Sequence, residues 1–246
     1  MQEEWIVGRN PVMETLKSDR SVNKVFILDN MKPQAAQQIQ RLARDRGVLV
    51  QKVPRKKLDQ IGKQHQGVAA SIAAYQYAEL DDLFQRASSE GEEPFFVILD
   101  ELEDPHNLGS IIRTADAVGA HGIIIPKRRS VQLTQVVAKT STGAIEHIPV
   151  ARVTNLSRTI DELKDRNVWV VGTDATGKED YRQMNGDMPI ALVIGSEGKG
   201  MSRIVKEKCD WLVRLPMVGK VTSLNASVAA SLLMYEVFRK RHTIGE

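Results

Sequence analysis

The chain of 246 residues is long enough for two small domains, and its composition, 42% hydrophobic and 26% charged, is ordinary for a globular protein. No apolar run approaches the roughly 18–20 residues that cross a bilayer, and the acidic start Met-Gln-Glu-Glu-Trp is unlike a signal peptide, so we expect neither a membrane span nor a secretory leader. The net charge of +3 is unevenly spread. Residues 1–75 carry 13 Lys and Arg against seven Asp and Glu, residues 76–92 carry one against five, and residues 93–246 carry 20 against 19. The basic first part suits a polyanion-binding module, although charge alone fits a solvated surface equally well.

Residues 1–75 alternate between helical and extended patterns, which is typical of a small α/β domain. The expected elements are an amphipathic stretch at 11–17, a strand at 24–28, a helix at 34–46, a strand at 48–53, a short helix at 56–61 and a strand at 68–74. Residues 76–92 are polar and acidic, and we expect a linker that holds a short helix around 80–87.

From residue 93 onward, apolar runs alternate with helical patterns, which predicts an α/β domain with an open, mainly parallel sheet covered by helices. The fully apolar run at 95–99 is typical of a buried parallel strand. Further strands are expected at 123–125, 168–171, 190–194 and 211–215, and helices at 107–118, 156–166, 201–208 and 223–241.

Three short segments in this half place small or polar residues after an apolar run and before a helical pattern. They are Asn107–Arg113, Val193–Gly200 and Leu215–Asn225. Loops in such positions are where an α/β sheet presents groups to a ligand.

The second segment holds Gly195, Gly198 and Gly200, which let the backbone approach a ligand closely. Their spacing is neither the dinucleotide-binding fingerprint nor a P-loop, and by itself it fits a tight strand-to-helix turn. In the third segment Ser223 is expected as an N-cap, and Asn225 in the first turn needs polar partners. In the first segment, Asn107 is the expected cap.

The order, spacing and residue types of these segments resemble the three motifs of the SPOUT RNA methyltransferases, in the branch that methylates ribose 2′-hydroxyls. The resemblance covers residues 93–246 and is specific, because three motifs match in sequence order. It implies a deep trefoil knot in this domain, S-adenosyl-L-methionine as the cofactor and a homodimer. It places cofactor contacts at Gly172, Thr173, Ile194, Gly195, Leu215, Met217 and Leu224, and the catalytic group at Asn107, Arg113, Glu197, Ser223 and Asn225.

The family places the equivalent of Arg113 near the methyl group, commonly across the dimer interface, and it has been cast there as the base. Since a guanidinium stays protonated in proteins, we prefer Arg113 as a clamp on phosphate or on developing oxyanion charge. Glu197 is then a rival base, or a group that orients Asn107 and Arg113.

The start Ile6–Leu16, with the α/β pattern that follows, resembles the ribosomal-protein-like RNA-binding domain of ribose methyltransferases that modify ribosomal RNA. We therefore predict three parts: an RNA substrate-binding domain at 1–75, a linker at 76–92 and a SPOUT methyltransferase domain at 93–246. The expected substrate is a guanosine of 23S rRNA, as in the bacterial enzymes of the RlmB type. A tRNA methyltransferase and a non-catalytic RNA-binding or ribosome-assembly module are the alternatives. The residues expected to bind RNA are Arg9, Asn10, Lys127, Arg128 and Arg129.

Metal and thiol chemistry are not expected. The five histidines show no ligand spacing, and the acidic residues 101, 103 and 104 fit solvated loop charges better than a metal site. The single cysteine, Cys209, excludes an internal disulfide, fits a cytoplasmic location, and is expected to be a packed thiol and not a nucleophile.

Overall fold

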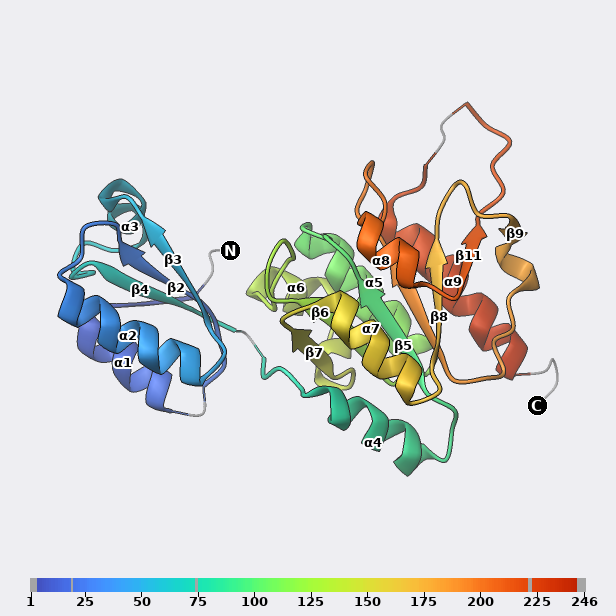
Figure 1. The fold of residues 1–246 in the computed structure, drawn as a ribbon, viewed down its shortest axis with the longest axis horizontal. Helices are drawn as coiled ribbons and strands as arrows, with labels where there is room; N and C mark the ends of the chain where they lie inside the picture. The colour runs from blue at the N-terminus through green and yellow to red at the C-terminus, as the bar shows by residue number, and fades with distance from the viewer. Residues whose placement is uncertain (1–3, 19, 74, 221–222, 243–246) are drawn as a thin grey trace. The chain divides into compact units, whose positions relative to one another are not determined.

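The computed structural model describes residues 4–18, 20–73, 75–220 and 223–242, and the chain forms two compact units (Figure 1). The first unit extends to Gln76 and also includes residues 132–136. The second comprises residues 77–131 and everything from Val137 onward.

The first unit is a four-stranded mixed sheet with helices packed against it. Its elements are β1 (Trp5–Val7), α1 (Arg9–Lys17), β2 (Val22–Leu28), α2 (Pro33–Asp45), β3 (Leu49–Val53), α3 (Arg55–Ile61) and β4 (Val68–Ile72). The strand order is β1-β4-β2-β3, in which only the β2–β3 pair is parallel.

The alternation of side chains along the strands gives this sheet two apolar faces. Val25 and Ile27 of β2 pack with residues of α1 and α2, while Phe26 between them packs with Leu58 of α3. The strand expected at 68–74 ends at Ile72, and residue 74 lies outside the described residues. The three-residue strand β1 was not expected from the sequence.

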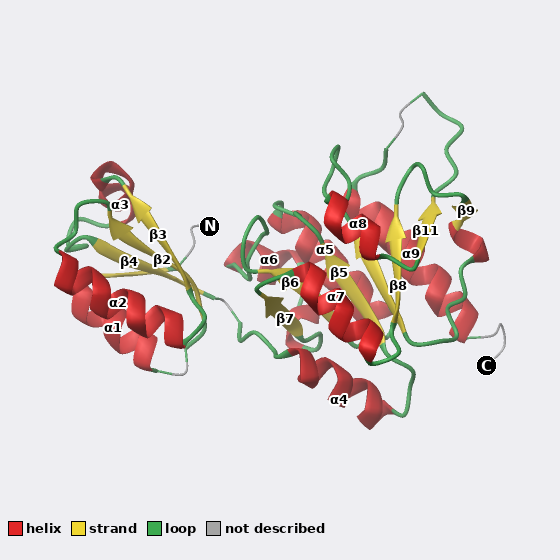
Figure 2. Cartoon of the chain, in the orientation of Figure 1, coloured by secondary structure: helices red, strands yellow, loops and turns green. Residues whose placement is uncertain are grey.

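The second unit alternates helices and strands throughout (Figure 2). Its elements are α4 (Leu80–Glu90), β5 (Phe95–Leu99), α5 (Pro105–Ala117), β6 (Gly122–Pro126), α6 (Gln135–Thr140), η1 (Ala144–Glu146), β7 (Val150–Val153), α7 (Leu156–Asp165), β8 (Trp169–Thr173), β9 (Glu179–Asp180), η2 (Tyr181–Gln183), β10 (Ile190–Ile194), α8 (Arg203–Lys208), β11 (Trp211–Arg214) and α9 (Ala226–Arg241).

These strands form one seven-stranded sheet in the order β7-β6-β5-β10-β8-β11-β9, and every pair is parallel. The expectation of a mainly parallel sheet is therefore confirmed. The central strands β5 and β10 are buried along their whole length, which explains why they are apolar at every position. Because all strands run the same way, their carboxyl ends lie at one edge of the sheet.

The segment expected as a linker is largely a packed helix, which corrects that expectation. Leu83 and Ala87 of α4 are buried in the core of the second unit, and Phe84 makes an edge-to-face contact with Phe96 of β5. The acidic residues that suggested a linker lie at the start of α4, where carboxylates offset the helix dipole: Asp82 also accepts a hydrogen bond from the backbone of Glu79 at 2.8 Å.

Two helix starts differ from the sequence expectation. Helix α5 begins at Pro105 and is capped by Asp104, whose carboxylate accepts a hydrogen bond from the backbone of His106, so Asn107 lies inside the first turn. Helix α9 begins at Ala226, and Asn225 caps it in place of Ser223. In both cases a better-placed Asx residue takes the cap position.

Among the described residues, no helix combines the length and the apolar character that a membrane crossing requires.

Candidate functional site

A polar network joins three segments that are far apart in the sequence. Asn107 lies in the first turn of α5, Glu197 in the loop after β10, and Asn225 at the start of α9. The Asn107 amide donates to Glu197 Oε1 at 3.0 Å, and the Asn225 amide donates to Asn107 Oδ1 at 3.0 Å and also to Glu197 Oε1. The backbone of Ala226 donates to the same Glu197 oxygen at 3.3 Å. The structure thus brings three of the five expected catalytic residues into direct contact.

Asn225 links this network to the fold. Its Oδ1 accepts hydrogen bonds from the backbone of Ser227 at 2.9 Å and of Val228 at 3.3 Å, so it satisfies amides that the helix leaves open. Its Nδ2 is thereby turned towards Asn107 and Glu197. The orientation of the amide is fixed from both sides, because the carboxylate accepts only and the helix amides donate only.

A cavity of about 510 Å³ adjoins the network at the carboxyl ends of β8, β10 and β11 and at the start of α9. Six of the seven residues expected to hold the cofactor line it, namely Thr173, Ile194, Gly195, Leu215, Met217 and Leu224. Met217 and Leu224 are more than a third exposed, although both are apolar. The cavity thus offers apolar side chains for a flat ring and backbone polar groups for specificity, the combination that an adenosine cofactor needs.

Two glycines of the expected site act through the backbone. A Cβ atom on Gly195 would lie 2.2 Å from the carbonyl carbon of Gly200, so only glycine lets the loop close on itself through the Ser196–Gly200 hydrogen bonds. Gly172 does not line the cavity. A Cβ atom there would lie 2.7 Å from Cys209 Sγ, so this glycine serves the packing beneath the site.

Asp174 is a lining residue that the sequence analysis missed. Burial favours the neutral acid, but hydrogen bonds from Lys206 and Thr176 outweigh it and hold the pKa of Asp174 below its ordinary value. Lys206 Nζ lies 2.8 Å from Asp174 Oδ2. Its position directly after the expected contact Thr173 was the one available signal.

A second cavity, of about 260 Å³, lies on the other side of the network. Asn107 and Glu197 line it together with the acidic loop 101–104 after β5, and Ser196, Glu197 and Lys199 are shared with the first cavity. The Glu197 carboxylate therefore stands between two spaces, one large enough for a cofactor and one open to a substrate group.

The other two expected catalytic residues are not in the network. Ser223 lines the larger cavity, and residues 221 and 222 of the same motif lie outside the described residues. Arg113 is exposed on α5 and makes no hydrogen bond or ion pair with another described residue. It lies six residues beyond Asn107, about 9 Å along the helix axis.

The residues expected to bind RNA have different surroundings. Arg9 donates to the backbone carbonyl of Gln66 at 3.3 Å, and Asn10 is exposed beside it at the start of α1. Arg128 is exposed, and Arg129 forms an ion pair with Glu101 at 3.3 Å. Lys127 is partly buried.

Glu90, Glu92 and His121 form the one group of potential metal ligands among the described residues. His121 is buried, and its Nδ1 accepts a hydrogen bond from the backbone of Phe95 at 3.0 Å. A neutral imidazole with that acceptor carries its proton on Nε2, which is the atom that faces the carboxylates. A metal would have to displace this proton, so the ring is set up to donate and not to ligate.

Profiles of two protein families match the chain. The "SpoU rRNA Methylase family" matches residues 94–235, and the family "RNA 2'-O ribose methyltransferase substrate binding" matches residues 5–78. A Bacillus subtilis (strain 168) protein, the putative TrmH family tRNA/rRNA methyltransferase YacO, is 67% identical over 246 residues, which are 100% of this chain and 99% of that protein.

Solved structures agree with this match. The AdoMet-bound rRNA methyltransferase from Sinorhizobium meliloti has a TM-score of 0.62 and 27% identity, over 97% of this chain and 88% of that one. The TrmH/SpoU tRNA modifying enzyme from A. aeolicus has a TM-score of 0.55 and 26% identity, over 65% of this chain and 84% of that one. The chain therefore belongs to the SpoU, or TrmH, family of RNA 2′-O-ribose methyltransferases, enzymes that use S-adenosylmethionine.

Proposed function

We propose that this enzyme methylates the ribose 2′-hydroxyl of a guanosine in 23S rRNA, as do the bacterial enzymes of the RlmB type. The observation that carries the choice of ribosomal RNA is the complete first unit, which matches the substrate-binding family over residues 5–78. The tRNA modifying enzyme corresponds to only 65% of this chain, whereas the rRNA methyltransferase corresponds to 97%. An RNA substrate and a single unpaired cysteine both fit a cytoplasmic enzyme.

The larger cavity is the proposed cofactor site. When bound, S-adenosylmethionine supplies an electrophilic methyl group for in-line attack by the ribose 2′-oxygen. The contribution of this chain is to hold the two reactants in line, and aligned reactants gain about 7–11 kcal/mol over free ones. Because Glu197 borders both cavities, the methyl group and the ribose would meet beside it.

Glu197 is proposed as the group that orients Asn107 and Asn225, and as the candidate acceptor for the hydroxyl proton. Its Oε1 already accepts three hydrogen bonds, whereas Oε2 makes none to a described residue and is free to face the substrate. Arg113 is proposed as a clamp on the target phosphate or on the developing oxyanion charge.

Arg113 would reach the site from a second copy of the chain. Helix α9 exposes Val228, Leu232 and Tyr235, at 48%, 40% and 51%, along a stripe next to α5. Such a stripe is costly to leave in water, and pairing it with itself in a two-fold dimer would bury it. Thr114 Oγ1 lies 3.1 Å from Ser231 Oγ, which places Arg113 at the rim of this surface.

The direct test is methyl transfer from labelled cofactor to 23S rRNA, 16S rRNA and tRNA, with the modified nucleotide mapped. We expect one guanosine of 23S rRNA to be labelled. Preferred labelling of tRNA would replace the proposed substrate. RNA binding without any methyl transfer, in protein shown to bind the cofactor, would favour a ribosome-assembly role.

A further inference from the structure

A separate cavity of about 330 Å³ lies at the ends of β6 and β7, and it shares no residue with the two cavities beside Glu197. Lys127 follows the last residue of β6, and Arg152 belongs to β7. Both strands are parallel to the rest of the sheet, so the cavity lies at the same edge as the cofactor cavity. This is the edge at which open α/β sheets bind their ligands.

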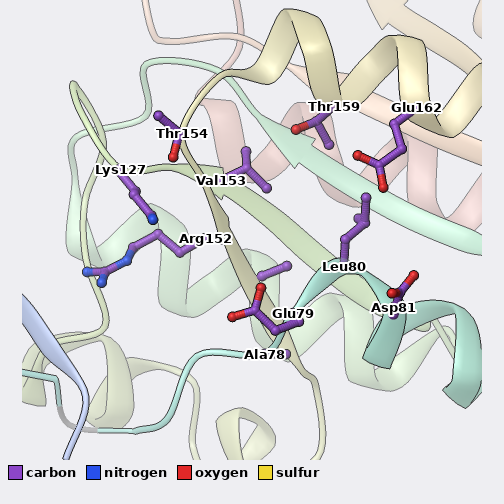
Figure 3. A pocket seen from close by; sticks show the side chains of 11 residues that line it. Ala78, Glu79, Leu80, Asp81, Lys127, Arg152, Val153, Thr154, Thr159 and Glu162 are labelled. Carbon is purple, nitrogen blue, oxygen red and sulfur yellow. The ribbon is translucent and has the colours of Figure 1, made fainter. Parts of the chain in front are cut away.

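The charges around the cavity are separated (Figure 3). Lys127, Arg152 and Thr154 lie on one side, Glu162 and Asp81 lie on the other, and Leu80 lies between. Asp81 is held by an ion pair of 2.6 Å with Arg166. The cationic side is therefore distinct from the acidic side, and the apolar side chain of Leu80 separates them.

Lys127 is not balanced by a neighbouring carboxylate. It is partly buried, and it forms no hydrogen bond or ion pair with another described residue through its side chain. Burial lowers the pKa of Lys127, repulsion from Arg152 lowers it further, and the attraction of Glu79 opposes both without cancelling them. An anion placed between the two cations would remove this repulsion.

We propose that Lys127 and Arg152, with the hydroxyl of Thr154, form a binding site for a phosphate group, supplied either by the backbone of the RNA substrate or by a free nucleotide. The first source rests on the RNA substrate of the enzyme. Glu197 follows β10 and Lys127 follows β6, with β5 between them. Two strand spacings are roughly 10 Å, so an RNA strand with its target ribose beside Glu197 would pass the cavity within a few nucleotides.

The first arm of the test uses inorganic phosphate as the probe. The thermal unfolding of the full chain is followed as phosphate replaces chloride at constant ionic strength, for the wild type, Lys127→Gln and Arg158→Gln. Arg158 is an exposed cation on the neighbouring helix α7 and lies outside the cavity. A saturable rise in Tm is expected for the wild type and Arg158→Gln and is absent from Lys127→Gln, because a ligand that binds only the folded state raises Tm. Lys127→Arg, which keeps the charge, should restore it.

The second arm measures the binding of poly(U) RNA as a function of salt. If the phosphate comes from RNA, Lys127→Gln should lower the slope of log K against log salt by about 0.7, the amount for one phosphate of a single strand, and Arg158→Gln should not. A change in this arm, alone or with the first, identifies RNA as the source, and a change in the first arm alone identifies a free nucleotide.

Equal behaviour of Lys127→Gln and wild type in both arms would overturn the proposal. All variants are also titrated with S-adenosylmethionine. Failure of the wild type to bind the cofactor would count against the proposed function, whereas normal cofactor binding with no phosphate effect would count against this site alone.

Discussion

At the scale of single residues, the candidate site depends on one carboxylate oxygen. Glu197 Oε1 accepts from two side-chain amides and one backbone amide, and these donors come from α5 and α9. A carboxylate is the side chain suited to this position, because both of its oxygens only accept.

Glu197→Gln should therefore abolish most of the activity while the protein stays folded. The new amide would turn a donor towards the donors of Asn107 and Asn225, so at least one hydrogen bond of the network is lost. We expect kcat to fall by about 100-fold or more, as when a preorganised polar group is removed from an active site. The control is Glu207→Gln, an exposed carboxylate 3.5 Å from Arg203 on α8. Full activity of Glu197→Gln would remove Glu197 from the site.

The cofactor cavity predicts a graded loss of affinity. Leu224→Ala and Met217→Ala remove apolar contact surface from its wall, and each should raise the Kd for S-adenosylmethionine by about 3- to 30-fold, since one buried side chain contributes about 1–2 kcal/mol. Ile204→Ala is the matched control, because Ile204 is 57% exposed and lies outside the cavity. Calorimetric titration that finds the same Kd for all three variants would place the cofactor elsewhere. Gly195→Val is less informative, because its Cβ would break the loop itself.

Cys209 should react slowly in the folded protein. Burial, followed by the charge of Asp210, raises the pKa of this thiol to about 12. At pH 8 only about one molecule in ten thousand would carry the reactive thiolate. Iodoacetamide should modify the unfolded chain quickly and the folded protein hardly at all, as mass spectrometry would show. Rapid labelling of the folded protein at pH 8 would contradict this burial.

Residues of the site differ in how far the sequence could predict them. Family motifs brought Asn107, Glu197 and Asn225 together, but the sequence alone did not show that Asn225 caps α9, since Ser223 has the same capping chemistry two residues earlier. Asp174 was missed because its role depends on Lys206, which is 32 positions away along the chain and reaches it only through the packing of α8.

At the scale of elements, helix α9 carries two functions on two faces. It buries Ala230, Leu233 and Val237 in the second unit and leaves its opposite stripe exposed. The sequence predicted this helix well but indicated that most of its face would be buried, because periodicity cannot distinguish a core face from an interface between copies. The strands β7 and β9 were missed for another reason: they are short and lie at the sides of the sheet, where the apolar pattern is weakest.

The proposed dimer predicts that two inactive variants restore each other. Arg113→Ala and Glu197→Gln should each be inactive, and mixing them should recover up to about a quarter of the wild-type activity, since heterodimers hold one intact composite site. Glu197→Gln is preferable to Asn225→Ala, because loss of the cap would cost about 0.5–2 kcal/mol of stability. The activity is measured after subunit exchange has been verified.

A control for this experiment lies in the apolar stripe itself. Leu232→Glu in both variants should prevent association and with it the recovery, whereas Ile204→Glu, another exposed apolar position, should not. No recovery despite exchange would mean that each site is completed within one chain.

At the scale of the whole molecule, the boundary between the units lies before α4 and not after it. Leu83 of α4 fills the space above Gly122, where even a Cβ atom would lie 2.3 Å from Leu83 Cγ. The sequence could not show this, because an acidic, polar helix start and a true linker have the same composition.

A fragment of residues 77–246 should therefore fold and bind the cofactor, whereas a fragment of 93–246 should be less stable by more than about 3 kcal/mol, since loss of a buried leucine side chain alone costs about 2–5 kcal/mol. Urea unfolding of the two fragments measures this difference. The longer fragment should bind 23S rRNA more weakly than the full chain, because it lacks the basic first unit. Equal unfolding midpoints would contradict the role of α4, and undiminished RNA affinity would contradict the capture role of the first unit.

The polar network joins residues 90 and 118 positions apart, and its last member opens the final helix of the described chain. A ribosome synthesising this protein therefore completes the cofactor-binding loops well before it completes the catalytic group. A partly made chain, or one cut before α9, would be chemically silent however well its earlier strands had folded. Such an arrangement spares the RNA around the site of synthesis from methylation by unfinished enzyme, and it makes activity a sensitive report on whether the whole chain has folded.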